Sequence, residues 1–189
     1  MTQARHQHTA PSEKTEEAPS LAPETGVDIT ALVERLDRPV VLIGLMGAGK
    51  SSVGKRLATM MGRGFVDADD AIEDAAQRTI PEIFAEFGEA YFRDGERRVI
   101  ARLMDEHSGV IATGGGAFVD PETRALILEK GIAAWSDCDI DTLVERTSRR
   151  NNRPLLKTGD PREILTRLLD DRGPLYDEAQ VRVKSASGP

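Results

Sequence analysis

The chain has 189 residues, of which 39% are hydrophobic and 30% charged, so it is long enough for one domain with its own core. Its net charge of -7 argues against nucleic acid as the main partner, because no excess of Lys or Arg is present to neutralise phosphates. No apolar run approaches the roughly 20 residues of a membrane helix, and one cysteine, Cys138, excludes an internal disulfide. We expect a cytoplasmic monomer that binds neither nucleic acid nor membranes.

The N-terminal residues differ in composition from the rest of the chain. Residues 1–27 are rich in Pro, Glu, Thr, Ser and Ala and almost lack bulky apolar side chains, so we predict a disordered tail. Residues 28–37 predict a short helical lead-in. One domain is expected to occupy residues 38–189.

Within that domain, short β-rich runs alternate with segments of helical spacing. The β-rich runs are 40–44, 64–69, 109–115, 131–136 and 181–185. The helical stripes are Val53, Leu57 and Met60 or Met61; Ile83, Phe84 and Phe87; Val99, Ile100, Leu103 and Met104; Leu143, Val144 and Thr147; and Ile164, Leu165, Leu168 and Leu169. This alternation predicts a three-layer α/β/α domain with a five-stranded parallel sheet.

A glycine-rich turn follows the first predicted strand. Residues 44–51 read GLMGAGKS and match G-x-x-x-x-G-K-[ST], with a strand before the match and a helix after it. Such glycines let backbone N–H groups point at phosphate oxygens, and the helix N-terminus adds its positive dipole end. Lys50 supplies a charge to the β- and γ-phosphates, and the Ser51 hydroxyl is suited to Mg²⁺. The pattern predicts a nucleoside triphosphate site rather than a plain strand–helix turn.

Two carboxylates stand at the end of the second predicted strand. Asp67 and Asp69 are two residues apart, so on a strand they would point to the same side at the edge where α/β sheets bind ligands. One would orient a water on Mg²⁺, and the other would accept a proton from an attacking hydroxyl. The alternative is a helix N-cap formed by Asp69 or Asp70.

Two further stretches suit a small anionic substrate. Arg93 follows Phe92 on the predicted middle helix, among acids that would hold it for bidentate capture of a carboxylate. Three glycines, Gly114 to Gly116, end the third predicted strand and would allow a ligand to approach the backbone closely. Taken alone, a helix arginine is more often simply solvated.

A basic run, RTSRRNNRPLL at residues 146–156, precedes a stretch punctuated by Gly159 and Pro161. We predict a lid over about residues 148–161, whose arginine would stabilise charge on a transferring phosphoryl group. The alternative is a solvated basic face.

Together these stretches resemble the shikimate kinase family. The motifs GLMGAGKSSVGKRLA, FVDAD, IFAEFGEAYFR, TGGG, RPLL and RGPLY occur in the family's order and approximate spacing, over roughly residues 38–185. The resemblance implies a P-loop kinase fold like that of nucleoside monophosphate kinases, with a lid and a substrate-binding region. It also implies transfer of the γ-phosphoryl group of ATP to the 3-hydroxyl of shikimate, in aromatic amino-acid biosynthesis.

The resemblance also implies roles for individual residues. ATP would be bound by Gly47, Ala48, Gly49, Lys50, Ser51, Ser52, Arg146 and Arg153. Shikimate would be bound by Asp69, Phe84, Phe92, Arg93, Gly114, Gly115, Gly116 and Arg172. Mg²⁺ would be held by Ser51 and, through water, by Asp67, and catalysis would depend on Lys50, Asp69 and Arg153.

The C-terminal end departs from the family pattern. The chain ends in SASGP (185–189), directly after the last predicted strand, whereas family members normally continue into a closing helix. We therefore expect part of one sheet face to be exposed beside residues 181–185.

Two alternative functions stay open on the sequence. Another small-metabolite P-loop kinase, such as a gluconate kinase, would share the P-loop. It would not require Arg93, the triple glycine and Arg172 together. A protein that binds ATP or shikimate without turnover should have lost a catalytic group, yet Lys50, Asp69 and Arg153 are all present.

Overall fold

A computed structural model describes residues 29–149 and 159–185 of the chain. The predicted tail, most of the predicted lid and the proposed catalytic Arg153 lie outside the described residues. No helix in the described ranges has the length and apolar character needed to cross a membrane.

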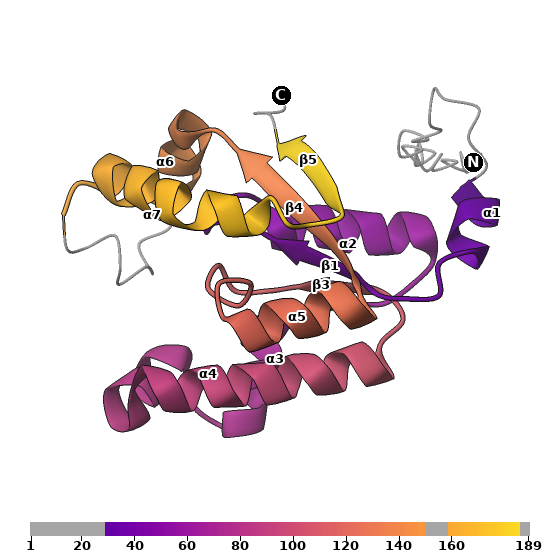
Figure 1. The fold of residues 1–189 in the computed structure, drawn as a ribbon, viewed down its shortest axis with the longest axis horizontal. Coiled ribbons are helices and arrows are strands. Elements are labelled where there is room, and N and C mark those ends of the chain that lie inside the picture. Colours follow the sequence, from indigo (N-terminus) through magenta and orange to yellow (C-terminus); the bar gives the residue numbers. More distant parts are fainter. Residues whose placement is uncertain (1–28, 150–158, 186–189) are drawn as a thin grey trace, which may run out of the picture.

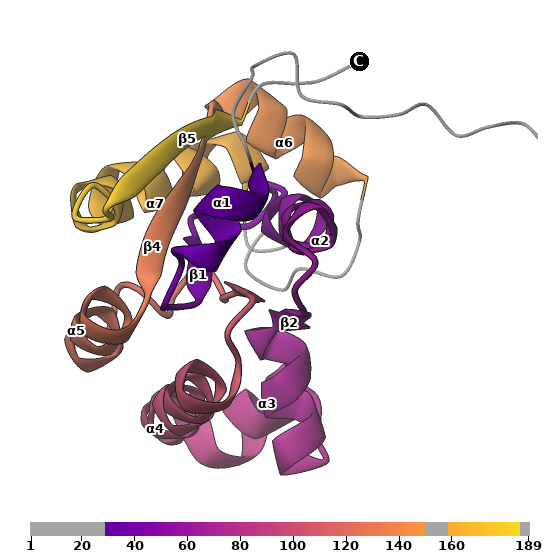
Figure 2. The ribbon, with the colours of Figure 1, turned by 90° about the vertical axis from the view of Figure 1, so that its right-hand side faces the viewer.

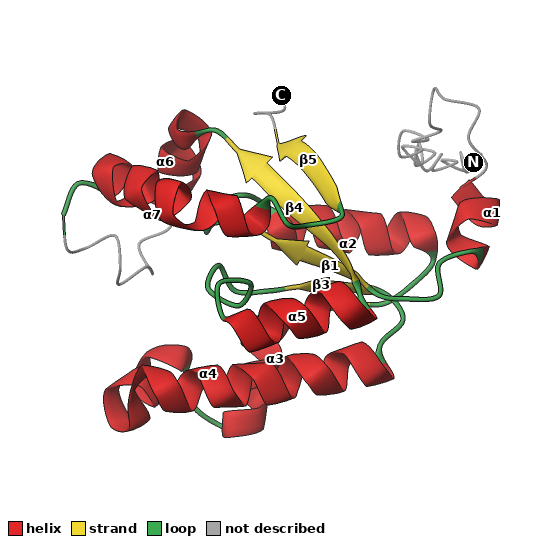
Figure 3. Cartoon of the chain, viewed as in Figure 1, coloured by secondary structure: helices red, strands yellow, loops and turns green. Residues whose placement is uncertain are grey.

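The described chain alternates strands with helices, as Figure 3 shows by colour. The strands are β1 (Val40–Ile43), β2 (Phe65–Asp67), β3 (Val110–Ala112), β4 (Ile132–Cys138) and β5 (Val181–Ser185). The helices are α1 (Ile29–Glu34), α2 (Lys50–Met61), α3 (Ala68–Ala76), α4 (Ile80–Glu106), α5 (Pro121–Lys130), α6 (Ile140–Ser148) and α7 (Pro161–Tyr176). All five strand predictions are confirmed, with ends that differ by at most three residues.

The strands form one parallel sheet in the order β2-β3-β1-β4-β5. Figure 1 shows β3, β1, β4 and β5, and Figure 2 shows β2. In the centre, Val40 of β1 is in register with Val110 of β3 on one side and Ile132 of β4 on the other. Because every pairing is parallel, the carboxyl ends of the strands share one edge of the sheet. The loops that follow β1, β2 and β3 therefore meet at that edge, where open α/β sheets bind ligands.

Successive side chains of β1 serve two different layers of the core. Val41 and Ile43 point into a cluster with helices α4 to α7, whereas Leu42 points into a smaller cluster with Ala58 of α2. This two-residue alternation follows from strand geometry, in which neighbouring side chains face opposite sides. Figure 2 shows α2 on one side of β1 and α5 on the other, which confirms the predicted three-layer arrangement.

The predicted buried stripe on α2 is only partly correct, because Leu57 and Met61 are half-buried against the core but Val53 and Met60 are not. Val53 and Met60 are 45% and 48% exposed, and the helix instead buries Gly54 and Ala58. The reason is a close approach to the sheet: a Cβ on Gly54 would lie 2.5 Å from the ring of Phe65. Small residues, which carry little hydrophobic signal, thus form the packed face of this helix.

Helix α4 is bent, and its two parts bury different amounts of apolar surface. Gly88 has φ 80° and ψ 178°, values outside the helical region, so the helix changes direction there. Before the bend Ile83 is buried as predicted, but Phe84 and Phe87 are exposed. After the bend Ile100 and Leu103 are buried as predicted.

Neither α3 nor α5 coincides with a predicted helical stripe. Both helices nevertheless carry N-terminal signals: Asp67 caps α3, and Asp120 caps α5 directly before Pro121.

At the far edge of the sheet, Val181 and Val183 of β5 are exposed. This agrees with the exposed face expected beside the last strand.

Candidate active site

The glycine-rich turn lies between β1 and the N-terminus of α2. Gly44, Gly47 and Gly49 have φ of 130°, 85° and 85°, a region that residues with a Cβ rarely adopt. The turn folds back over the Lys50 ammonium, whose Nζ donates to the carbonyls of Gly44 (2.8 Å) and Leu45 (2.9 Å). The predicted phosphate cradle therefore has the required backbone shape, with its lysine inside the loop.

The two carboxylates after β2 lie beside this cradle. The Ser51 hydroxyl donates to Asp67 Oδ2 at 2.7 Å, and the backbone N–H of Asp69 donates to Asp67 Oδ1 at 3.1 Å. The predicted strand geometry is wrong in one respect, because α3 begins at Ala68 and Asp69 belongs to its first turn. Asp67, rather than Asp69 or Asp70, is the N-cap. Both carboxylates still face the edge of the sheet because the helix starts there.

Asp69 is half-buried, and its surroundings favour the protonated form. Burial raises the pKa of its carboxyl to about 6, and the neighbouring Asp67 adds to the effect while the Lys50 ammonium opposes it. A carboxylate with a pKa near 6 is a better proton acceptor than an ordinary aspartate and is still ionised at neutral pH.

The cradle and the carboxylates share one cleft of about 700 Å³. It is lined by Met46, Gly47, Gly49, Lys50, Ser51, Ser52, Val53, Arg56, Asp67, Asp69, Thr113, Gly114, Gly115, Arg146, Arg149 and Ser185. Ten of the predicted site residues are in this set, drawn from the turn after β1, the start of α2, the end of β2, the start of α3, the loop after β3, and α6. Ala48 is not, since it is buried in the core.

Arg146 reaches the cleft from α6. Its Nη1 donates to Ser185 Oγ at 3.1 Å and lies 3.8 Å from Cys138 Sγ. A Cβ on Gly49 would lie 3.4 Å from the same nitrogen, so Arg146 is directly beside the glycine-rich turn. The sequence analysis did not single out Arg56 and Ser185; an isolated arginine and an isolated serine carry no motif.

The triple glycine, residues 114–116, forms a turn that joins two charged groups. A Cβ on Gly114 would lie 2.7 Å from Asp69 Oδ1, and one on Gly116 would lie 2.6 Å from Arg93 Nη2. At both positions a side chain would occupy the space of a functional group. The prediction that these glycines permit close approach therefore has a specific reason.

A carboxylate that the sequence analysis missed holds Arg93. Glu96 is 1% exposed, and its Oε2 accepts from Arg93 Nη1 at 2.6 Å, while the exposed Glu89 accepts from Nη2 at 3.3 Å. Burial disfavours the charge on Arg93, but Glu96 and Glu89 outweigh it and raise the pKa of the guanidinium. Burial also raises the pKa of Glu96, against the influence of Arg93. The three-residue spacing on one helix could have revealed this pair.

Arg172 comes to the same turn from α7. Its Nη1 donates to the carbonyl of Gly115 at 2.9 Å, across 57 residues of sequence. Arg93 and Arg172 thus contact neighbouring residues of one glycine turn, as a pair that grips one anion would require.

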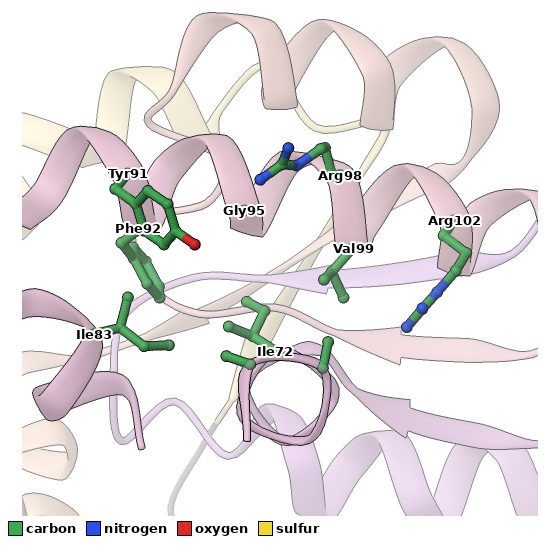
Figure 4. A pocket seen from close by; sticks show the side chains of 10 residues that line it. Ile72, Ile83, Tyr91, Phe92, Gly95, Arg98, Val99 and Arg102 are labelled. Atoms are coloured by element: carbon green, nitrogen blue, oxygen red, sulfur yellow. The ribbon is translucent and has the colours of Figure 1, made fainter. Parts of the chain in front are cut away.

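The two aromatic residues predicted to bind shikimate, Phe84 and Phe92, lie outside the 700 Å³ cleft. Phe92 is buried with Ile72 and Ile83 between α3 and α4, and its ring centroid is 4.6 Å from that of Phe84. Figure 4 shows Phe92 at one end of a second cavity of about 360 Å³ between these helices. Neither aromatic ring lines the 700 Å³ cleft, so their role as walls of a substrate pocket stays a prediction.

Ser51 and Asp67 provide a donor set suited to Mg²⁺. Both are oxygen donors, their side chains are 2.7 Å apart, and they lie at the mouth of the phosphate cradle. Mg²⁺ in nucleotide sites takes one or two protein oxygens and completes its shell with phosphates and water. The described residues contain no group of three or more His, Cys, Asp or Glu suited to hold a metal.

Comparisons with known proteins identify the family. The family model described as shikimate kinase matches residues 46–188. The chain belongs to the shikimate kinase family. A shikimate kinase from Novosphingobium aromaticivorans is 59% identical over 166 residues, 86% of each chain. A shikimate kinase from Caulobacter vibrioides is 57% identical over 152 residues, 80% of this chain and 76% of the relative.

A solved shikimate kinase has the same fold. The structure from Acinetobacter baumannii, determined in complex with shikimate, superposes with a TM-score of 0.78 at 38% identity. The match covers 84% of this chain and 89% of that one. The family, the fold and the kinase class predicted from the motifs are therefore confirmed.

Proposed function

We propose that this protein transfers the γ-phosphoryl group of ATP to the 3-hydroxyl of shikimate, giving shikimate 3-phosphate and ADP in the pathway to chorismate and the aromatic amino acids. One observation carries the proposal. Asp69 lines the same cleft as Lys50 and packs against Gly114, so it joins the phosphate cradle to the glycine turn that meets Arg93 and Arg172.

The nucleotide occupies the cradle side of the cleft. The backbone of Gly47 to Ser52 surrounds the phosphates, and Lys50 exchanges its loop carbonyls for β- and γ-phosphate oxygens. Arg146 lies beside Gly49, where it contacts the nucleotide further from the γ-phosphate. Family membership supports ATP as the donor.

Ser51 and Asp67, whose side chains are hydrogen-bonded to each other, would hold Mg²⁺, the serine directly and the aspartate through water. The ion, when bound, neutralises charge on the transferring phosphoryl group. The hydrogen bond between the two side chains keeps their oxygens on the same side of the cradle.

Shikimate occupies the opposite side. Its carboxylate lies between Arg93 and Arg172, which supply local positive charge in a protein of net charge -7. Gly114 to Gly116 and the rings of Phe84 and Phe92 complete the pocket. The complex of the Acinetobacter relative with shikimate supports the choice of ligand.

Asp69 accepts the proton of the acceptor hydroxyl as its oxygen attacks the γ-phosphorus. Its carboxylate is ionised at neutral pH, and its pKa of about 6 makes the transfer less unfavourable than at an ordinary aspartate. Most of the rate enhancement comes from positioning and charge stabilisation, to which Arg153 contributes from the predicted lid. The catalytic domain at residues 38–189, the monomeric state and the cytoplasmic location are part of the same proposal.

The test is ADP release from ATP and Mg²⁺, measured with shikimate, with gluconate, with shikimate methyl ester and with no acceptor. We expect release with shikimate only, and at least a tenfold higher KM for the methyl ester, because it lacks the charge that the two arginines bind. Equal release with gluconate and shikimate would favour a different small-metabolite kinase. Folded protein that binds ATP but releases no ADP would contradict the proposal.

A further inference from the structure

Tyr176 is a fully buried residue at the C-terminal end of α7 that the reaction itself does not use. Its ring centroid lies 5.8 Å from that of Trp135, inside the main core cluster. Its hydroxyl donates a 2.5 Å hydrogen bond to the carbonyl of Gly115, in the middle of the glycine turn. Burial raises the pKa of this phenol, so the hydroxyl keeps its proton and stays a donor.

The carbonyl of Gly115 has two donors from the same helix. Tyr176 and Arg172 are four residues apart on α7, so their side chains lie on one face of the helix. A carbonyl oxygen has two lone pairs and accepts both bonds at once. Helix α7 is therefore attached to the glycine turn at one atom, through one neutral donor and one charged donor.

Fixing that carbonyl fixes the turn on both sides of it. The peptide that joins Gly115 to Gly116 is planar, so the direction of its carbonyl sets the direction of the Gly116 N–H. Gly114 lies against Asp69, and Gly116 lies against Arg93. A rotation of the Gly115 peptide would change both contacts and would also leave Arg172 with a displaced acceptor.

We propose that Tyr176 is a positioning residue for the acceptor side of the site: its hydroxyl holds the Gly115 carbonyl and so keeps the glycine turn and Arg172 in the geometry that binds shikimate. This inference rests on the proposed function. It differs from a merely structural role, in which loss of the hydroxyl would lower stability and affect both substrates alike.

The chain contains two tyrosines, which gives a matched control. Tyr176→Phe removes the hydroxyl and keeps the ring against Trp135. Tyr91→Phe makes the same chemical change at an exposed position, where the ring stacks on Phe87. We expect Tyr176→Phe to raise KM for shikimate about three- to tenfold, the size of one hydrogen bond, with KM for ATP within twofold of wild type. Tyr91→Phe should match wild type in both constants.

An unchanged KM for shikimate in Tyr176→Phe, or equal rises in both KM values, would overturn the inference. If wild type shows no shikimate-dependent ADP release, the proposed function itself fails. If wild type is active and Tyr176→Phe is indistinguishable from it, only the inference fails.

A second measurement uses protein in which the hydroxyl at position 176 is intact. It therefore tests the inference even if Tyr176→Phe does not fold. In the Tyr91→Phe background, 3-fluorotyrosine labels position 176 alone. Its ¹⁹F resonance should shift on addition of shikimate and change little on addition of ADP, because the label reports on the glycine turn. A resonance that shikimate leaves unchanged would overturn the inference.

Discussion

The two sides of the proposed site, the phosphate side in the 700 Å³ cleft and the acceptor side next to it, are assembled in different ways. The phosphate side is almost entirely one segment, residues 44–52, in which Lys50 bonds carbonyls five and six residues before it. The acceptor side combines Arg93 and Glu96 on α4, the glycine turn after β3, and Arg172 on α7. One of its hydrogen bonds spans 57 residues and another spans 61.

This difference determines which mutations stay local. A substitution on the phosphate side should impair phosphoryl transfer without weakening the binding of shikimate on the acceptor side. On the acceptor side, a change in one segment should be transmitted to the others through the glycine turn, since Gly114, Gly115 and Gly116 each contact a different charged residue.

The largest expected effect is that of Lys50→Ala. Because the ammonium is the cradle's charged donor to the transferring phosphoryl group, we expect kcat to fall about a thousandfold. Calorimetric affinity for shikimate alone should stay within about twofold of wild type, because the arginines proposed to bind its carboxylate, Arg93 and Arg172, lie on other helices. Lys55→Ala, on the exposed face of the same helix, is the control. A parallel loss of shikimate binding would show that the two sides are not independent.

Asp69→Asn connects the two sides and should reduce kcat about a hundredfold, within the range for loss of a general base. It should also change stability in a pH-dependent way, in metal-free and nucleotide-free protein. The pKa of Asp69 is about 6 in the native state against an ordinary value of 3.8. Wild-type stability therefore falls as the pH rises through this window, by up to about 3 kcal/mol, because the unfolded state releases its proton first.

The side chain in Asp69→Asn does not titrate. The free energy of unfolding of this variant should therefore rise relative to that of wild type between pH 4 and pH 6.5, and the difference should stay constant above pH 6.5. Urea unfolding at pH 4, 5.5 and 7.5 measures the difference, with the exposed Asp74→Asn as control. A stability difference that does not depend on pH would contradict the assigned environment of Asp69.

Gly116→Ala should have the smallest effect of the three and should act on the acceptor side alone. The new Cβ would lie within 3.0 Å of three guanidinium atoms of Arg93, so the arginine must move. We expect KM for shikimate to rise about fivefold, as expected for the loss of about 1 kcal/mol of binding, with little change in KM for ATP. Gly95→Ala, where a Cβ meets nothing within 4 Å, should leave both constants unchanged. Equal KM changes for both substrates would argue against a separate acceptor side.

The sequence predicted the features that have a local signal and missed those that do not. The strands and the glycine-rich cradle are contiguous patterns, and both were predicted correctly. The stripe on α2 was wrong in part because Gly54 and Ala58 pack by their small size, which hydrophobic periodicity does not register. The start of α3 was missed because Asp67 ends a strand and caps a helix at once.

The acceptor side was predicted only in part for a physical reason. Arg93 and Arg172 were chosen from motifs; the partner of Arg93, Glu96, is three residues away on the same helix, whereas the contact of Arg172 with Gly115 depends on the tertiary fold. Glu96 functions through its burial, and Tyr176 through a carbonyl 61 residues away, and neither property is written in the local sequence. The family resemblance implied that Arg93 and Arg172 bind the same carboxylate, which their spacing in the sequence alone does not indicate.

The most direct test of the central claim is the product itself. Wild-type protein with equimolar ATP and shikimate in Mg²⁺ buffer would be followed by ³¹P and ¹H NMR. We predict a single phosphomonoester whose phosphorus couples to the proton on carbon 3 of shikimate, formed in step with ADP. ADP accompanied only by inorganic phosphate, with shikimate unchanged, would contradict an acceptor bound between Arg93, Arg172 and Asp69.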